Sequence, residues 1–326
     1  MALTANVSVC SSVNAQFNGW DSAGLWILRT RTRRSRTLGY MVLRSAQIRW
    51  WGLVCAGAAV GAVTVGTSSY RDASLWQVWA ALAVGLTGSA GAVFGYGTAR
   101  WRELPGEERT DGRADALVFT ALICCWLATA LVLGAVRHDM SWRGPVLVAT
   151  ALFGSIPCAC TMMAVRRAAG RADIRTDAEQ VAWLIERRRL LRGLLAAVGS
   201  LVALSTLALG ASVQLQQKLL ETHQIDPSHV VPSQTVVVFG GVGSLVVALG
   251  YGPAASELAR RGRELCTRLF DISQAPDGPT LLSRLDDRHK LEMLLGADSG
   301  SFTDFQSGLV VLAPLLASAS SFLLPR

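Results

Sequence analysis

The chain has 326 residues, of which 51% are hydrophobic and only 17% are charged, and its formal net charge at pH 7 is +8. Soluble domains carry roughly a quarter charged residues, whereas here the charges are absent from several long windows and concentrated between them, which argues against a soluble fold. The positive charge does not indicate a nucleic-acid partner, because the arginines cluster at the ends of apolar segments instead of along one folded face. The sequence therefore predicts an all-α polytopic membrane protein embedded in a lipid bilayer.

The first 40 residues are rich in Ser, Asn and Arg and contain no hydrophobic stretch long enough for a signal peptide. Met41 follows them, just ahead of a short basic flank and the first apolar window. We interpret Met41 as the true start, or else residues 1–40 as disordered. Segment 1–49 is accordingly expected to be a basic, disordered cytoplasmic region.

Six windows contain no Asp, Glu, Lys, Arg or His and are close to the length of about 20 apolar residues that a bilayer requires. They are expected to form a six-helix transmembrane domain over residues 50–252. The spans are expected at approximately 51–67, 75–98, 116–136, 145–165, 193–213 and 233–252. A seventh apolar window, 308–324, carries Pro314 at its centre and makes the C-terminal segment 308–326 a candidate seventh span.

The basic residues alternate from side to side when the chain is divided in this way. Of the 31 Lys and Arg residues, all lie on one side except Arg71, Arg137, Arg143, Lys218 and the terminal Arg326. Short basic loops stay in the cytoplasm, so the N terminus is expected inside. The richness in Ala, Val, Leu, Gly and Arg favours a bacterial plasma membrane. The residues expected to determine topology include Arg33, Arg34, Arg166, Arg167, Arg187, Arg188, Arg189, Arg260 and Arg261.

Three stretches on the basic side have apolar residues at helical spacing and are expected to extend beyond the bilayer as helices. Residues 173–192 lead into the fifth span, with Val181, Leu184 and Leu191 near one face. Residues 254–270 continue the sixth span, and residues 280–295 form a separate helix within the cytoplasmic segment 253–307. Their apolar faces predict internal packing, with partner docking or self-association as the alternative.

Small residues recur at four-residue intervals in several of the spans. Such faces let helices approach closely and pack by dispersion, since lipid offers no hydrophobic drive for association. They predict helix packing within one protomer, with oligomerisation as the alternative. The residues are Gly57 and Gly61, Gly91 and Gly95, and Gly240, Ser244, Ala248 and Gly252.

The spans hold no ionisable side chain that could relay protons across the bilayer. Their hydroxyl groups could coordinate a solute, although such hydroxyls commonly bond carbonyls of their own helix. The pairs Cys124–Cys125 and Cys158–Cys160 could offer soft ligands to Cu(I), but cysteine is equally a small apolar residue. We interpret them as packing residues, so no metal or cofactor is expected.

No catalytic motif is found along the chain. Walker, nucleophile-elbow, zinc-peptidase and dinucleotide-binding patterns are all missing from the sequence. The expected function is that of a non-enzymatic membrane scaffold or effector that forms homo-oligomers or binds a membrane-protein partner. The alternative is a channel or transporter for a neutral or hydrophobic solute. A membrane-embedded enzyme would require His289, Asp286 and Glu292 to meet Glu103 or Glu107.

Overall fold

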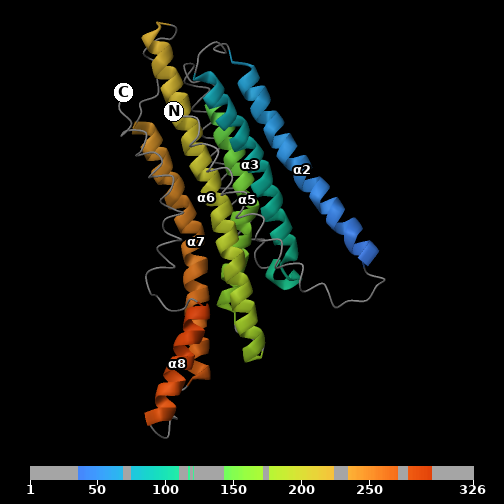
Figure 1. Cartoon of the computed structure of the whole chain (residues 1–326), viewed down its shortest axis with the longest axis vertical. Coiled ribbons are helices and arrows are strands. Elements are labelled where there is room, and N and C mark those ends of the chain that lie inside the picture. The colour runs from blue at the N-terminus through green and yellow to red at the C-terminus, as the bar shows by residue number, and fades with distance from the viewer. Residues whose placement is uncertain are drawn as a thin grey trace, which may run out of the picture. The chain divides into compact units, whose positions relative to one another are not determined.

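The computed structural model describes residues 36–68, 75–109, 117, 120, 143–171, 176–223, 234–270 and 278–295. Every regular element in these ranges is a helix, which confirms the predicted all-α class for this part of the chain (Figure 1). The elements are α2 (Arg36–Gly66), α3 (Trp76–Glu103), α5 (Arg143–Gly170), α6 (Asp177–Glu221), α7 (Gln234–Leu269) and α8 (Gly278–Leu295).

Five of these helices are long and apolar enough to cross a membrane, which indicates a membrane protein. They are α2 from Ile48 onward, α3, α5, α6, and α7 from Thr235 onward. Each contains all but at most one residue of a predicted span, extended by further helical turns. The predicted span 116–136 lies almost wholly outside the described residues, and the candidate span 308–324 lies entirely outside them. The number of spans therefore stays a prediction.

Helix α2 begins earlier than the sequence predicts. Residues 36–49 are helical, which differs from the disorder expected for them as part of segment 1–49. Lengthening an existing helix costs much less free energy than nucleating a new one, so turns preceding the apolar window can join it. Met41 lies within this helix, and residues 1–35 lie outside the described residues.

Helix α6 is a single helix of 45 residues, so residues 177–192 of the predicted amphipathic stretch and the fifth apolar window form one element. Its start is defined by Thr176, whose backbone N–H donates to the Glu179 carboxylate at 3.1 Å. Asp177 and Glu179 place negative charge in the first turn, where it stabilises the positive end of the helix dipole. This start lies well before the apolar window.

Close contacts at glycines establish the direction in which neighbouring helices run. Gly91 of α3 lies against Leu53 of α2, and Gly57 of α2 lies against Thr87 of α3, so this pair is antiparallel. Gly154 and Gly97 show the opposite relation between α3 and α5. Gly154 meets Ala90, while Gly97 meets Cys158, so residue numbers rise together and these two helices are parallel.

Helix α6 occupies the centre of the described helices. It packs against α3, α5, α7 and α8, and Figure 1 shows α3, α5 and α6 side by side. Gly243 of α7 approaches Val202 and Gly210 of α6 approaches Val236, so α6 and α7 are antiparallel. The core between these helices combines leucines with small side chains such as Ala83, Ala164 and Cys158.

Candidate functional site at the basic end

The glycines predicted to pack helices lie between α2 and α3. A Cβ atom at Gly57 would stand 2.1 Å from the Thr87 carbonyl oxygen, and one at Gly91 would stand 2.1 Å from the Leu53 carbonyl oxygen. Neither distance is sterically allowed, so each position requires glycine unless the backbones separate. The four predicted glycines with a neighbouring atom closer than 3.0 Å to such a Cβ are Gly57, Gly61, Gly91 and Gly95.

The four small residues predicted to share one face of α7 have different surroundings. Gly240 and Ser244 are buried and Ala248 is half-buried, whereas Gly252 is exposed, with open space where a Cβ would lie. Gly243, which the four-residue pattern does not include, makes a close contact with Val202 of α6, where a Cβ would lie 2.7 Å from a methyl carbon. The structure thus brings only part of this predicted face against a neighbouring helix.

The contact between α3 and α5 uses two glycines that sequence reasoning missed. A Cβ at Gly97 would lie 2.7 Å from the Cys158 backbone nitrogen, and one at Gly154 would lie 2.7 Å from the Ala90 carbonyl oxygen. Gly154 belongs to no glycine pair at four-residue spacing within its own helix. Its partner is an alanine of another helix, so only the three-dimensional packing identifies the pair.

The buried hydroxyls of the apolar windows mostly bond their own helix, as the sequence suggested. Thr64 donates to the Val60 carbonyl at 2.8 Å, and Thr206 donates to the Val202 carbonyl at 2.9 Å. Thr87, Ser200 and Ser205 make similar bonds within their helices. Among the residues that the structure describes, Ser244 has a buried hydroxyl oxygen without a hydrogen-bond partner.

The largest concentration of polar contacts lies at what we call the basic end, where α3, α5 and α7 finish and α6 begins. Its centre is a buried ion pair between Glu108 and Arg187, whose side chains are only 8% and 7% exposed. An Arg187 terminal nitrogen (Nη2) lies 3.1 Å from Oε2 and 3.3 Å from Oε1 of Glu108. Glu108 comes from a helical turn at 106–109 that follows α3.

Trp183 completes this cluster from one turn earlier on α6. Its indole Nε1–H donates to Oε1 of Glu108 at 3.2 Å. The Arg187 guanidinium carbon lies 5.8 Å from the centre of a Trp183 ring, which is within the range of a cation–π contact. The carboxylate therefore accepts from two donors that α6 presents on one face, and the cluster joins the end of α3 to the start of α6.

A signal for this cluster is present in the sequence. The buried residues Gln180, Leu184, Arg187 and Leu191 follow one another at intervals of four, three and four. An arginine between two leucines on a buried helical face requires a partner, because an unpaired buried charge is costly. Sequence reasoning assigned Arg187 to topology alone and did not find Glu108, which lies 79 positions earlier.

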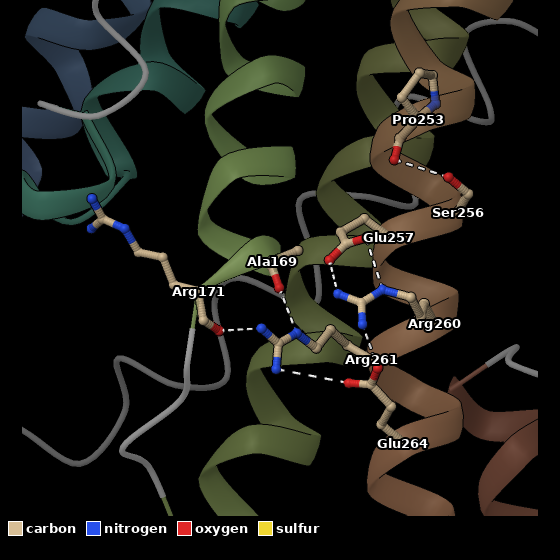
Figure 2. A network of polar contacts seen from close by, with 8 residues as sticks. All are labelled: Ala169, Arg171, Pro253, Ser256, Glu257, Arg260, Arg261 and Glu264. Carbon is tan, nitrogen blue, oxygen red and sulfur yellow. Dashed lines mark hydrogen bonds and ion pairs between the residues drawn. The ribbon is translucent and has the colours of Figure 1, made fainter.

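Other arginines at this end bind the last carbonyl groups of neighbouring helices. Arg261 of α7 donates from Nε to the Ala169 carbonyl at 2.7 Å and from Nη2 to the Arg171 carbonyl, at the end of α5 (Figure 2). Arg188 of α6 donates to the Leu295 carbonyl, at the end of α8. The final carbonyls of a helix have no N–H partner within it and carry partial negative charge. Each guanidinium group supplies the missing N–H donors and places a positive charge beside the negative end of the helix.

An arginine also caps a neighbouring helix at the opposite end of the helices. Arg143, the first residue of α5, donates to the Thr67 carbonyl just beyond the end of α2. The three contacts have in common that the arginine and the capped helix end belong to different helices. Each therefore fixes one helix terminus to a neighbour in addition to satisfying a carbonyl group.

Helix α7 also carries ion pairs along its surface. Arg260 bonds Glu257 and Glu264 of its own helix, and Ser256 donates to the Pro253 carbonyl at 3.1 Å (Figure 2). Further along, Arg268 pairs with Asp177 and donates to the Gln180 side chain at 2.7 Å. This last contact joins α7 to the start of α6.

The remaining arginines of the predicted topology set have other environments. Arg166, Arg167 and Arg189 are exposed at the basic end. Arg33 and Arg34 lie outside the described residues.

Three of the residues that a membrane-embedded enzyme would need, Asp286, Glu292 and Glu103, are engaged in separate ion pairs. Asp286 lies 2.6 Å from Lys290, and this carboxylate raises the pKa of Lys290. Glu292 pairs with Arg288 at 2.7 Å, and Glu103 pairs with Arg100 at 2.7 Å. Within the described ranges, no group of three or more His, Cys, Asp or Glu residues is arranged to hold a metal ion.

Comparisons of the chain with protein-family models, with curated proteins and with solved structures found no match.

Proposed function

We propose that this chain is a multi-pass protein of a bacterial plasma membrane, with its N terminus and basic end in the cytoplasm, and that it acts as a non-enzymatic scaffold or effector. It would act by associating with further copies of itself or with a membrane-protein partner. The observation that carries the proposal is the exposed apolar surface of α8, described below.

The parallel arrangement of α3 and α5 supports several crossings. Both helices finish at the basic end, so the chain leaves that end at Arg109 and returns from the opposite end at Arg143. A crossing between these residues is what the apolar window 116–136 predicts. Together with the antiparallel pairs α2–α3 and α6–α7, this gives the alternation that a polytopic membrane protein requires.

The polar groups of the apolar windows support a scaffold more than a transporter. The windows contain no Asp, Glu, Lys, Arg or His, and most of the described buried hydroxyls are used within their own helices. A pathway for a polar solute needs groups that are free to replace the solute's water. Flux of a small neutral solute into liposomes containing the purified protein would favour the transporter instead.

Helix α8 supports association because it exposes large hydrophobic side chains outside the predicted spans. Leu282 is 68% exposed and Leu294 is 69% exposed, and Leu285 and Met293 are exposed as well. Clustered apolar surface in water commonly marks an interaction site. The helix itself is held in place at its end, where the Leu295 carbonyl accepts from Arg188.

The test is the oligomeric state of the full chain in mild detergent, measured by light scattering during gel filtration. We expect assemblies larger than the monomer, and their reduction to monomer in the variant L282S/M293S, which changes two side chains on one side of α8. Both side chains are exposed, so the melting temperature of that variant should match the wild type. The variant D287N, exposed on a different side of α8, is the matched control and should remain assembled. A strictly monomeric wild type that co-purifies with no other protein would contradict the proposal.

A further inference from the structure

Two arginines of α6, Arg189 and Arg192, differ from Arg187 and Arg188 on the same helix. Arg189 and Arg192 are exposed, and within the described part of the chain neither has an ion-pair or hydrogen-bond partner. By contrast, Arg187 is paired with Glu108 and Arg188 binds the Leu295 carbonyl. The two arginines are separated by three positions, so they lie on the same side of the helix. Their Cβ atoms are within about 6 Å of each other.

The exposed side of α6 continues from these arginines directly into the apolar window. Ala196, Ser200 and Leu207 follow Arg189 and Arg192 at helical spacing and are also exposed. Arg192 immediately precedes the apolar window that begins at position 193. In the proposed topology this stripe faces lipid, and the two guanidinium groups lie at the level of the inner-leaflet phosphates.

The side chains along this stripe favour a diacyl lipid. Guanidinium groups bind phosphate oxygens through paired hydrogen bonds, and anionic lipids enrich the cytoplasmic surface. Ala196 and Ser200, directly above the arginines, are short and leave room beside the helix for an acyl chain. Glu186 lies one turn further from the apolar window and is 73% exposed. This carboxylate is therefore on the water side of the two arginines, away from the acyl chains.

We propose that Arg189 and Arg192 bind the phosphate group of an anionic phospholipid of the inner leaflet, whose acyl chains lie over Ala196 and Ser200. The site rests on the proposed topology, which places this end of α6 at the cytoplasmic surface. It does not depend on the scaffold function, since it uses a different helix from the exposed surface of α8.

The experiment is native mass spectrometry of the full-length protein in mild detergent, titrated with dioleoylphosphatidylglycerol or dioleoylphosphatidylcholine. We expect saturable retention of phosphatidylglycerol and weaker retention of phosphatidylcholine. In R189Q/R192Q the apparent affinity for phosphatidylglycerol should fall roughly thirtyfold. Each basic residue near the membrane surface contributes about a fivefold factor to the binding constant, and the variant removes two of them. If the double variant does not fold, R189Q and R192Q are measured singly, and each should lose roughly fivefold.

Two matched variants serve as controls. R263Q removes an exposed arginine of α7 that lies beyond the apolar window, and E186Q alters the same stripe of α6 without removing an arginine. Both should retain phosphatidylglycerol at least as well as the wild type. Equal losses in R263Q and R189Q/R192Q would show a general charge effect and overturn the site, and so would equal retention of the two lipids by the wild type.

A third arm separates a lipid from a free anion. Inorganic phosphate at millimolar concentration should leave phosphatidylglycerol retention unchanged, and displacement by it would overturn the proposal of a lipid site. Failure of this proposal is distinguishable from failure of the scaffold function. A chain that assembles without selective lipid retention contradicts only the lipid site, and a monomer that retains phosphatidylglycerol contradicts only the scaffold.

Discussion

At the scale of single residues, the partner determines what each arginine contributes. Arg187 is buried and paired with a carboxylate, Arg188 and Arg261 cap helix ends, and Arg189 and Arg192 point outward. All five lie at the basic end and look alike as topology signals in the sequence. Their energetic roles differ because burial makes the loss of a partner costly, whereas water replaces a lost partner at the surface.

The buried pair gives a prediction about stability. Replacing Arg187 by Met leaves the Glu108 carboxylate buried without its cation, so R187M should lower the free energy of unfolding by about 3–5 kcal/mol. The double variant E108L/R187M removes both charges and should recover most of that loss. The apparent melting temperature in detergent, followed by tryptophan fluorescence, measures both effects.

The control for this experiment is E186Q, next to Arg187 but exposed to solvent. Its change should stay within about 0.5 kcal/mol, as is typical of surface substitutions. A double variant as unstable as R187M would mean that the shape of the cluster, and not the unpaired charge, accounts for the loss.

At the scale of helices, two helices come into close contact where a glycine, which has no side chain, lets their backbones approach each other. Gly57 and Gly91 bring α2 and α3 together, and Gly97 and Gly154 bring α3 and α5 together. Helix α3 therefore has two neighbouring helices whose backbones approach it closely at glycines. Dispersion between closely packed backbones is the main attraction available to helices in lipid.

Two glycines of α3 provide a matched comparison. A Cβ at Gly91 would collide with the Leu53 carbonyl oxygen, whereas a Cβ at Gly85 would have no neighbour within 4 Å. We expect G91A to lower stability by about 1–3 kcal/mol through overpacking. G85A should be neutral or should stabilise by up to about 1 kcal/mol, because alanine favours the helix. Equal melting temperatures for the two variants would contradict the close approach of α2 and α3.

The capping of α5 by Arg261 gives a local prediction. R261Q removes charged donors from the Ala169 and Arg171 carbonyls, so the last turns of α5 should open more readily. Amide hydrogen exchange in residues 164–170 should accelerate by roughly ten- to a hundredfold, since a charged hydrogen bond contributes about 1.5–3 kcal/mol and about 1.4 kcal/mol is a factor of ten.

Arg260 is the control for this measurement, because its ion pairs lie along the exposed surface of α7, where solvent screens them and they contribute little to stability. R260Q should leave exchange in residues 164–170 unchanged. Acceleration of the same size in both variants would assign the effect to lost charge and not to the cap.

At the scale of the whole molecule, composition and the spacing of apolar residues predict the helices well. Positions 76–98, 145–165, 193–213 and 234–252 of the predicted windows lie inside observed helices, because an uninterrupted apolar stretch is a local property of the chain. The helical residues 177–192 and 254–269 belong to stretches predicted by their amphipathic spacing for the same reason. The sequence also predicts that these stretches continue the spans, and α6 and α7 are single helices that do so.

The contacts between helices could not be predicted in the same way. Arg261 and Arg188 bind backbone carbonyls, which every residue possesses and which therefore leave no mark in the sequence. Glu108 and Arg187 are distant in the chain, and nothing near Glu108 identifies it as buried. Gly97 and Gly154 lie at contacts whose partners, Cys158 and Ala90, are defined by the packing of two helices.

The topology of the chain gives a further prediction. A reporter that is active only outside the cytoplasm should be inactive when inserted at 172–175 and active when inserted at 224–230. Fused after Arg326 it should be active, because we expect window 308–324 to span. The end of α8 supports this expectation, since Leu295 contacts Arg188, only about one helical turn before the apolar window of α6. An inactive reporter at Arg326 would leave six spans.

The length of α6 has a mechanical consequence. Its 45 residues extend over about 68 Å at 1.5 Å per residue, roughly twice the thickness of the hydrocarbon core. An uninterrupted helix is stiff, so a tilt at one end moves the other end as well. A small tilt imposed on α6 at its Glu221 end would therefore displace Trp183, Arg187 and Arg188 sideways, and with them the termini of α3 and α8. Force applied on one side of the membrane would thus be felt as movement on the other.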